Sequence, residues 1–413
     1  MDIGDRRRRH ALATLRHRDF ALLWGGQLVS TVGDQIQVVA ISWHIYVLTG
    51  SPLQLGLVGV VRAVPFLVLT LIGGAIADTV DRRKVLLATQ GFQMAVSAWL
   101  VIETFAGTAS ELTLYAVTFL TGAAQAFDIP TRQALVTNVV PEDELAGAYN
   151  LNTLLRQVSM ILGPGVGGVL IGQVGLGWSY AANGISFLLL MGSVLAMRPV
   201  PVAGGRRTTW DMVVGGLNYA LRQPLVRGPL IVDFLTRSLG SSRGLLPIFA
   251  KDVFNAGPEG LGLLNSALSI GAVAGGLALG ARGTIRRPVP VMLAGYAAEA
   301  IGLVCLGLAP AFGMAIVALF GMGIANVVGE VPRVTLVQLS TPNELRGRVS
   351  ALAYMFTYGG PQFGQLDSGA LAEAFGPNPA AVIGGLLALA AVAIFGAPLL
   401  RKTTPNTEPA VAT

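Results

Sequence analysis

Long apolar stretches follow one another along almost the whole chain, separated only by short polar turns. About 20 apolar residues are enough to cross a bilayer as a helix, and helices satisfy their own backbone hydrogen bonds in lipid. The sequence therefore predicts an all-α polytopic membrane protein with twelve transmembrane helices. The predicted helices span 20–48, 53–77, 85–106, 111–137, 145–173, 177–197, 225–250, 259–281, 288–309, 311–338, 347–372 and 379–400.

The composition excludes a chain built from soluble domains. Only 12% of the 413 residues are charged, against about 25% in soluble proteins, and the mean hydropathy is +0.64. The net charge of +6 comes from short basic clusters between the apolar stretches. Such clusters suit anionic lipid headgroups, so we expect membrane lipid rather than nucleic acid as their partner.

Residues that carry chemistry are scarce in this sequence. The single cysteine, Cys305, allows no internal disulfide, and the three histidines have no metal-ligand spacing. None of the three lysines follows a glycine, which excludes a Walker-type phosphate loop. We therefore expect no metal and no cofactor, and any pumping would use an ion gradient or a partner ATPase as its energy source.

A polar break divides the predicted helices into six plus six. It contains two prolines, two glycines and Arg206-Arg207, and Trp210–Leu221 is predicted to lie along the membrane surface as an amphipathic helix. The predicted organisation is an N-terminal segment (1–19), a six-helix half (20–197), a linker (198–224), a second six-helix half (225–400) and a tail (401–413).

The two halves repeat each other in the same direction. Glu144-Leu145-Ala146-Gly147 recurs as Glu344-Leu345-Arg346-Gly347 at an offset of 200 residues, and Asp128-Ile129-Pro130 recurs as Glu330-Val331-Pro332 at an offset of 202. Matches at nearly one offset indicate an internal duplication. Parallel six-helix repeats are one plan of secondary transporters, whose substrate site lies between the halves near the middle of the bilayer.

Two motifs resemble signatures of the major facilitator superfamily. The turn Gly74-x-x-x-Asp78-x-x-Asp81-Arg82-Arg83 resembles its signature between helices 2 and 3, with Asp81 where Gly is usual, and Gly163-Pro164-x-x-Gly167-Gly168 is similar to the core of its antiporter signature. Leu15–Trp24, Gly33-Asp34 and Pro141–Leu145 resemble the branch that contains enterobactin exporters and macrolide efflux proteins. The resemblance covers residues 15 to 400 and implies the twelve-helix fold of that superfamily.

The resemblance also implies roles for the motif residues. The turn would belong to a cytoplasmic gate, together with basic residues on helices 4 and 10; the gate set is Gly74, Asp78, Arg82, Arg83, Arg132 and Arg333. The glycines and Pro164 of the second motif would belong to an antiporter. From the residues alone, close packing of small side chains explains the second motif equally well.

Polar side chains form a stripe along the first predicted helix. At 100° per residue, all of them lie within about 60° of Asp34; they are Gln27, Ser30, Thr31, Asp34 and Gln37. Asp34 lies about 21 Å from the start of this helix. A carboxylate at that depth must be paired, hydrated or protonated. Asp34 is therefore a candidate for proton exchange, and a structural pair with an arginine is the alternative.

Further polar residues lie within the other predicted helices. The candidate substrate cavity comprises Gln27, Thr31, Asp34, Gln37, Asn152, Arg156, Arg237, Tyr354 and Tyr358. The candidate proton-coupling acids are Asp34, Asp128, Glu299 and Glu330. Arg156 and Arg237 would attract an anionic substrate or neutralise an acid, and the tyrosines would stack on an aromatic substrate or pack between helices.

Two acid–base pairs recur at equivalent places in the halves. Asp128 and Arg132 are four residues apart, and Glu330 and Arg333 are three apart, so each pair lies on one helix face. We interpret them as gate pairs that break and re-form as the halves move; static salt bridges are the alternative.

Together these features predict a transporter that exports a small organic compound, such as a drug or a siderophore, in exchange for protons by alternating access. A proton-coupled importer and a non-transporting receptor or scaffold are the alternatives. An enzyme would need a catalytic cluster at one membrane face, and the short loops contain none. We expect a monomeric transporter in the inner (cytoplasmic) membrane.

The distribution of Lys and Arg predicts that both termini are cytoplasmic, because basic residues are retained on that side. In a Cys305→Ala background, a cysteine at Ser51 or Ala109 should react with an impermeant thiol reagent in intact cells. A cysteine at Thr79 or Thr284 should not react. The reverse labelling pattern would invert the predicted orientation.

Overall fold

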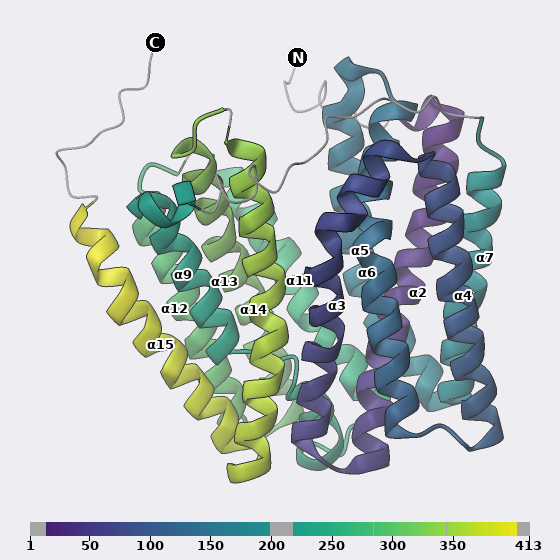
Figure 1. Ribbon diagram of the computed structural model, residues 1–413. Helices are drawn as coiled ribbons and strands as arrows, with labels where there is room; N and C mark the ends of the chain where they lie inside the picture. The colour runs from purple at the N-terminus through teal and green to yellow at the C-terminus, as the bar shows by residue number, and fades with distance from the viewer. Residues whose placement is uncertain (1–13, 199–217, 284, 344, 403–413) are drawn as a thin grey trace. The chain divides into compact units, whose positions relative to one another are not determined.

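The computed structural model describes residues 14–198, 218–283, 285–343 and 345–402, with the side chains of Leu71, Ala75, Ala77, Asp78, Ala351, Arg401 and Lys402 left out. Within these ranges every regular element is a helix (Figure 1). The elements before the linker are η1 (Thr14–Arg16), α2 (Arg18–Thr49), α3 (Pro52–Thr79), α4 (Arg82–Ala106), α5 (Glu111–Val139), η2 (Glu142–Glu144), α6 (Leu145–Val174) and α7 (Leu176–Leu195). Those after it are α9 (Pro224–Leu239), α10 (Leu246–Ile248), η3 (Phe249–Val253), α11 (Gly257–Arg282), α12 (Pro288–Gly307), α13 (Phe312–Leu339), α14 (Arg346–Phe375) and α15 (Pro377–Lys402).

The predicted all-α polytopic fold is confirmed, and the described part of the chain has one long helix for each predicted one. Nine of the helices described are long and apolar enough to cross a membrane by length and composition alone. The other long helices are α2, α9 and α14. They fall short because α9 has only 16 residues, and because α2 and α14 carry polar side chains that must be covered by neighbouring helices.

The prediction of one continuous helix over 225–250 is wrong, because the helix is interrupted near its middle. α9 ends at Leu239, where the N–H of Gly240 bonds to the Thr236 carbonyl, and helical structure returns only at Leu246. The intervening residues include Gly240, Gly244 and two serines, which have low helix propensity. The Ser238 hydroxyl donates to the Gly360 carbonyl, so α14 packs directly against this break. A hydropathy window averages over such a break and does not detect it.

The predicted surface helix at Trp210–Leu221 lies largely outside the described residues. Of that helix and its end, residues 218–222 are described, and they are helical. The two copies of the Glu-Leu-x-Gly repeat begin near α6 and α14, and Glu344 lies outside the described residues.

Contacts divide the chain into two compact units. The first unit comprises residues 1–54, 60–208 and 255–266, and the second comprises 55–59, 209–254 and 267–413. Each unit therefore includes a short piece of a helix whose remainder belongs to the other. The predicted half boundaries at 197 and 225 stay a prediction.

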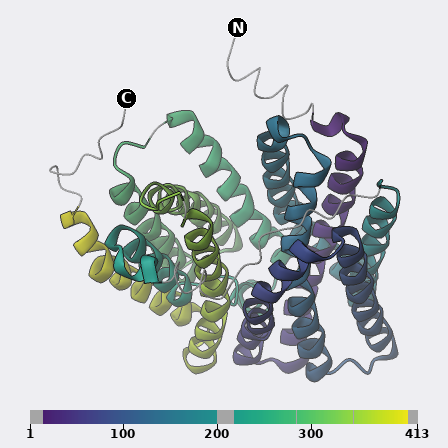
Figure 2. The same ribbon diagram turned by 45° about the horizontal axis from the view of Figure 1, so that its top comes forward.

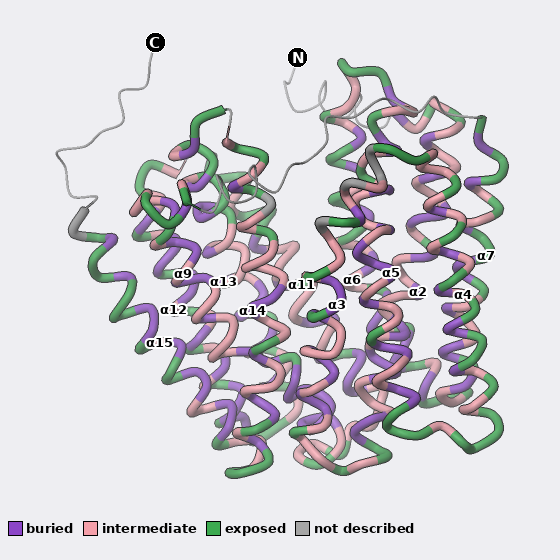
Figure 3. The backbone as a smooth tube through the Cα atoms, in the orientation of Figure 1, coloured by how far each residue is buried: buried purple, intermediate pink, exposed green. Residues whose placement is uncertain are grey.

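In the first unit, α2 packs against α5, α6 and α7, and α4 packs against α5 and α7. A core cluster of buried residues from α2, α4, α5, α6 and α7 includes Phe20, Leu86, Leu135, Leu151 and Leu190. Figure 3 shows buried residues recurring along one side of these helices, as expected when one face of each helix packs inward.

In the second unit, α12 packs against α13 and α15. The core cluster there includes Val232 of α9, Met292 and Tyr296 of α12, and Val392 and Leu399 of α15. Figure 2, turned so that the top comes forward, shows these teal to yellow helices gathered into a bundle. This bundle positions the buried acid described below.

Glycine permits a close helix contact between α3 and α5. A Cβ atom on Gly122 would lie 2.5 Å from the carbonyl oxygen of Arg62, whereas one on Gly192 of α7 would meet nothing within 4 Å. Gly122→Ala should therefore force the two backbones apart and lower the free energy of unfolding by about 1–3 kcal/mol. Gly192→Ala should leave the stability unchanged or slightly higher.

Thermal unfolding of the purified protein in detergent compares the two variants directly. Equal midpoints for Gly122→Ala and Gly192→Ala would contradict a backbone contact at Gly122.

Candidate functional site

The carboxylate of Asp233, on α9, is completely buried in the second unit. One oxygen accepts hydrogen bonds from Nε of Arg237 at 2.7 Å and from the hydroxyl of Tyr296 at 2.8 Å. The other accepts one from the hydroxyl of Thr357 at 3.1 Å and lies 3.5 Å from Nε of Arg333. Four helices, α9, α12, α13 and α14, thus hold a single carboxylate. A buried charge is stable only with such compensation.

Glu330, on α13, adds a second negative charge to this group. Its Oε2 lies 3.4 Å from Nη2 of Arg237, and its Oε1 lies 3.9 Å from Nη2 of Arg333. The side chain of Glu330 is 38% exposed, whereas that of Arg333 is 3% exposed. We call Asp233, Arg237, Glu330 and Arg333 the second-unit ion cluster; its two acids and two arginines balance in charge.

Glu299, on α12, lies near the second-unit ion cluster. Its Oε1 accepts a hydrogen bond from the side-chain amide of Asn326 at 3.1 Å. Its Oε2 is buried and has no hydrogen-bond partner among the described residues. The charges of Arg237, Asp233 and Glu330 act on it. A buried carboxylate oxygen without a donor favours a bound proton or water.

The first unit contains a comparable group around Asp128, on α5. Nε of Arg132 lies 2.5 Å from Oδ2 of Asp128. The Gln90 amide and the Thr89 hydroxyl donate to Oδ1 at 2.7 and 3.2 Å. Arg132 also reaches the hydroxyl of Ser30 on α2 at 3.4 Å. We call these five residues the first-unit ion cluster; it ties α2, α4 and α5 together.

Asp34, on α2, lies close to the first-unit ion cluster but is not bonded to it. The charges of Arg132, Asp128 and Arg62 act on Asp34, yet it has no hydrogen-bond or ion-pair partner within the described residues. Arg62, on α3, instead donates to Oε1 of Gln125 at 3.1 Å. Asp34 is therefore a half-buried acid whose proton-accepting oxygens are not committed to a described donor.

The polar stripe predicted on α2 is divided between two environments. Gln27 and Gln37 are buried, and Oε1 of Gln37 accepts a hydrogen bond from the Asn183 amide of α7 at 2.5 Å. Thr31 and Asp34, by contrast, are half-buried. One edge of the stripe is therefore buried between helices, and the other edge is partly accessible. Sequence periodicity alone could not separate these edges.

The polar residues of α6 lie on the outside of the first unit. Arg156 is exposed and Asn152 is half-buried. At 100° per residue, Arg156 lies roughly opposite the exposed apolar Leu154 and Val169. One side of α6 thus offers a cation and an amide, and the other offers an apolar surface suited to lipid.

Two tyrosines of the predicted cavity stack on each other in the second unit. The ring centroids of Tyr354 and Tyr358, on α14, are 6.2 Å apart with an interplanar angle of 22°. Tyr354 is 40% exposed. Arg237 of the same cavity set is held in the second-unit ion cluster. The structure thus brings together Arg237 with two of the predicted coupling acids, Glu299 and Glu330.

The basic turn between α3 and α4 ties three helices together. Asp81 is the N-cap of α4 and accepts a hydrogen bond from the N–H of Arg83 at 2.9 Å, which explains an aspartate at this place. Arg82 donates to the Ala134 carbonyl of α5 and Arg83 to the Val194 carbonyl of α7. Cations at helix C-terminal ends are favourable.

Two other predicted gate residues lie in the same part of α3. Gly74 has open space around it, and the side chain of Asp78 lies outside the described residues. The contacts of the gate proposed for Asp78 therefore stay a prediction.

The glycines of the antiporter-type motif face two different helices. Cβ atoms on Gly163 and Gly167 would meet α2 at Gln35 and Ile36. One on Gly168 would meet the backbone of α11 at Gly262. Pro164 lies inside α6 and removes one backbone N–H there. Both close approaches depend on the absence of a side chain.

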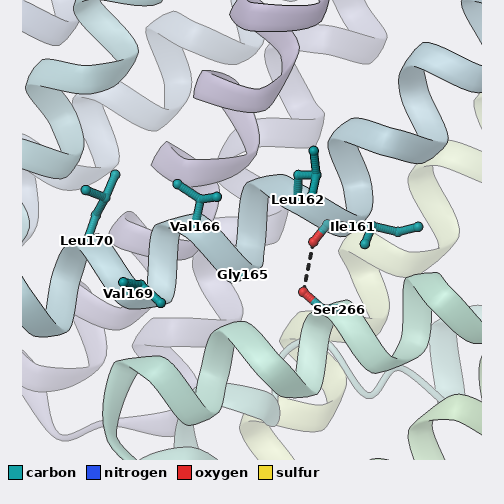
Figure 4. A pocket seen from close by; sticks show the side chains of 7 residues that line it. All are labelled: Ile161, Leu162, Gly165, Val166, Val169, Leu170 and Ser266. Atoms are coloured by element: carbon teal, nitrogen blue, oxygen red, sulfur yellow. Dashed lines mark hydrogen bonds between the residues drawn. The ribbon is translucent and has the colours of Figure 1, made fainter.

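A groove follows α6 beside this motif. It has a volume of about 440 Å³, and Leu162, Val166 and Val169 form its apolar wall (Figure 4). The hydroxyl of Ser266, on α11, donates to the Ile161 carbonyl at 2.8 Å and closes one end (Figure 4). With so little polar surface, the groove is less suited to a charged ligand than the ion clusters.

Sequence reasoning missed Asp233, although a signal for it was present. Asp233 and Arg237 have the same four-residue spacing as Asp128 and Arg132, which places acid and base on one helix face. The contribution of Tyr296 had no such signal, because the contact joins two helices far apart in sequence. Within the described residues, no group of three His, Cys, Asp or Glu residues could hold a metal ion.

Comparison with known sequences identifies relatives over most of the chain. The sequence profile of a family described as "transmembrane secretion effector" matches residues 9–411. The enterobactin exporter EntS of Shigella boydii serotype 18 is 26% identical over 339 residues, which cover 81% of each chain. EntS of Citrobacter koseri is 24% identical over 372 residues, 89% of each chain.

Solved structures with the same fold are membrane transporters. A POT family transporter in complex with a thioalcohol-conjugated peptide aligns with a TM-score of 0.74 at 12% identity, covering 94% of this chain and 97% of that one. The nucleoside transporter NupG aligns with a TM-score of 0.72 at 13% identity, covering 92% and 99%. At these identities the likeness concerns the fold alone.

The buried charge of Asp233 leads to a stability prediction. Asp233→Asn would leave Arg237 and Arg333 with only the partly exposed Glu330 as their shared acid, which should lower the free energy of unfolding by about 3–5 kcal/mol. Glu330→Gln should cost less than about 1 kcal/mol, because Glu330 is partly exposed and its charge is screened. Chemical unfolding in detergent compares them, and equal losses would contradict a central role for Asp233.

Proposed function

Because the chain belongs to the transmembrane secretion effector family of the major facilitator superfamily, we propose that it exports a small organic compound in exchange for protons. The family and the relatives are transporters, so this multi-pass membrane protein is a transporter and not an enzyme. Direction, coupling ion and substrate class belong to the proposal. The EntS relatives are named as enterobactin exporters, which supports export and a siderophore as the compound carried. A drug is the other compound that we propose, and it rests on the sequence resemblance alone.

One observation supports proton coupling. In each unit, a carboxyl group that lacks some or all of its hydrogen-bond partners lies beside an ion cluster whose charges balance. Asp34 has no bonded partner among the described residues, and Glu299 has one carboxylate oxygen without a donor. Both lie within the range of arginine charges. Such acids can gain or lose a proton without dismantling the ion pairs that hold the helices.

The four proposed coupling acids differ in what a proton would disturb. Protonation of Asp128 would weaken its ion pair with Arg132 and its bonds to α4. Protonation of Glu330 would weaken its links to Arg237 and Arg333. We therefore assign proton exchange first to Asp34, then to Glu299, and assign conformational coupling to Asp128 and Glu330.

The substrate is proposed to contact the polar residues that are not buried in helix packing. In the first unit these are Thr31, Asp34, Asn152 and Arg156; in the second they are Arg237, Tyr354 and Tyr358. Gln27 and Gln37 are buried between helices, so we propose that they support α2 from behind and do not contact substrate.

Transport by alternating access would occur in the inner membrane with both termini cytoplasmic. The proton gradient would supply the energy without a cofactor, and one chain would suffice. The turn of Gly74, Asp78, Arg82 and Arg83, with Arg132 and Arg333, would form the cytoplasmic gate. The motif of Gly163, Pro164, Gly167 and Gly168 would keep α6 close to its neighbours throughout the cycle.

A cellular experiment tests export and its energy source together. A strain that expresses the chain is challenged with a panel of toxic compounds, and siderophore secretion is measured in a deletion strain. We expect resistance or secretion that a protonophore abolishes. Higher intracellular accumulation would indicate import, and no change for any compound would favour a receptor or scaffold.

Proton exchange at Asp34 makes a specific prediction. Asp34→Asn is neutral at every pH, so it should bind substrate but lose proton-driven transport in everted vesicles by at least tenfold. Glu111→Gln, at the exposed start of α5, is the matched control and should transport normally. Full proton-driven transport by Asp34→Asn would move the proton to Glu299, and Glu299→Gln tests that assignment in the same vesicles.

A further inference from the structure

A second groove lies in the second unit, between the beginning of α9 and the end of α15. Its volume is about 180 Å³. Its walls include Pro224, Gly228 and Ile231 of α9 and Phe395 and Pro398 of α15. The side chain of Leu399 packs directly on the backbone of Gly228, where any larger residue would displace it. This contact keeps the two helices together along the groove.

The groove faces away from the transport machinery. At 100° per residue, Ile231 lies about 160° around α9 from Asp233, and Asp233 faces the second-unit ion cluster. From Pro224 to Ile231 the groove extends about 10 Å along α9 from its first residue. An occupant would therefore lie at one end of the membrane-spanning bundle and outside the site of proton exchange.

One charged side chain lines the groove. Arg227 is exposed, and its Nη1 donates to the Leu221 carbonyl at 3.3 Å, which holds the guanidinium near the chain that enters α9. A guanidinium has five N–H donors, and within the described residues this is the hydrogen bond that the Arg227 side chain makes. The guanidinium can thus receive an anion while it remains positioned.

The sequence around the groove is basic and lacks acids. Within the described residues that enter and begin α9, 218–232 contain Arg222 and Arg227 and no acidic residue. In α15, residues 377–400 contain no acidic residue. An apolar groove with a positive edge at the end of membrane-spanning helices has the chemistry of an anionic-lipid site.

We propose that this groove binds one anionic phospholipid. Its acyl chain would lie against Ile231, Phe395 and Pro398, and its headgroup phosphate would pair with Arg227. A zwitterionic lipid would fit the apolar walls equally well. The cationic amine of its headgroup, however, would oppose the attraction of its phosphate to the basic edge of the groove. The proposal rests on the groove and on membrane embedding, and it is independent of the proposed export function.

The test uses the full chain and measures lipid binding without any transport assay. The purified protein is titrated with phosphatidylglycerol or phosphatidylcholine, and bound lipid is counted by native mass spectrometry. We expect phosphatidylglycerol to bind more tightly than phosphatidylcholine. Arg227→Gln should weaken phosphatidylglycerol binding about fivefold, the effect of one basic residue near a lipid surface, and should abolish most of the preference.

Two further variants separate the groove from general surface charge. Arg282→Gln removes an exposed arginine at the end of α11 and should leave binding unchanged. Ile231→Trp fills the groove without altering charge and should weaken binding of both lipids, with its folding checked by thermal unfolding.

Three results would overturn the proposal. They are equal binding of the two lipids by the unaltered chain, equal losses for Arg227→Gln and Arg282→Gln, and normal phosphatidylglycerol binding by a folded Ile231→Trp variant. The last two would mean that headgroups are attracted by surface charge alone. Each of these results leaves the proposed export function untouched, because none depends on transport.

Discussion

A carboxylate that leaves water must be neutralised by the protein, and the second unit is organised around one such group. Asp233 has no exposed surface, and side chains from three other helices surround it: Tyr296, Arg333 and Thr357. Helices in lipid gain little from apolar contact with each other, because lipid tails are equally apolar. The shared buried charge therefore favours the one arrangement of these helices in which all its partners reach it.

Sequence patterns predicted features that depend on neighbours along the chain and missed those that depend on neighbours in space. The helix ranges and the pairing of Asp128 with Arg132 follow from hydropathy and a four-residue spacing. The burial of Gln37 depends on how α2 is rotated against α7. The break after Leu239 depends on local propensity and on packing by α14. Neither the burial of Gln37 nor the break after Leu239 produces a periodic signal in the sequence.

Close helix approach explains why one short motif on α6 serves two neighbours. Gly163 and Gly167 lie against α2, while Gly168 lies against the start of α11. Gly163 and Gly167 are four residues apart and share one face of α6, whereas Gly168 lies about 100° around the helix from Gly167. Close packing of small side chains accounts for these glycines. The proposed antiporter would use the same residues, because α6 would then move against two neighbours and contact both.

The internal duplication makes the difference between the two units informative. At an offset of 202 residues, Asp233 and Arg237 correspond to Thr31 and Gln35 of α2. The first helix of the second unit thus carries an acid with its own arginine one turn later, and that acid is fully bonded. On α2 the acid is instead Asp34, and no arginine follows it one turn later. The first helices of the two repeats thus carry acids in different states: Asp233 holds helices together, whereas Asp34 has no bonded partner among the described residues, and this difference is why the proposed proton exchange is placed first on Asp34.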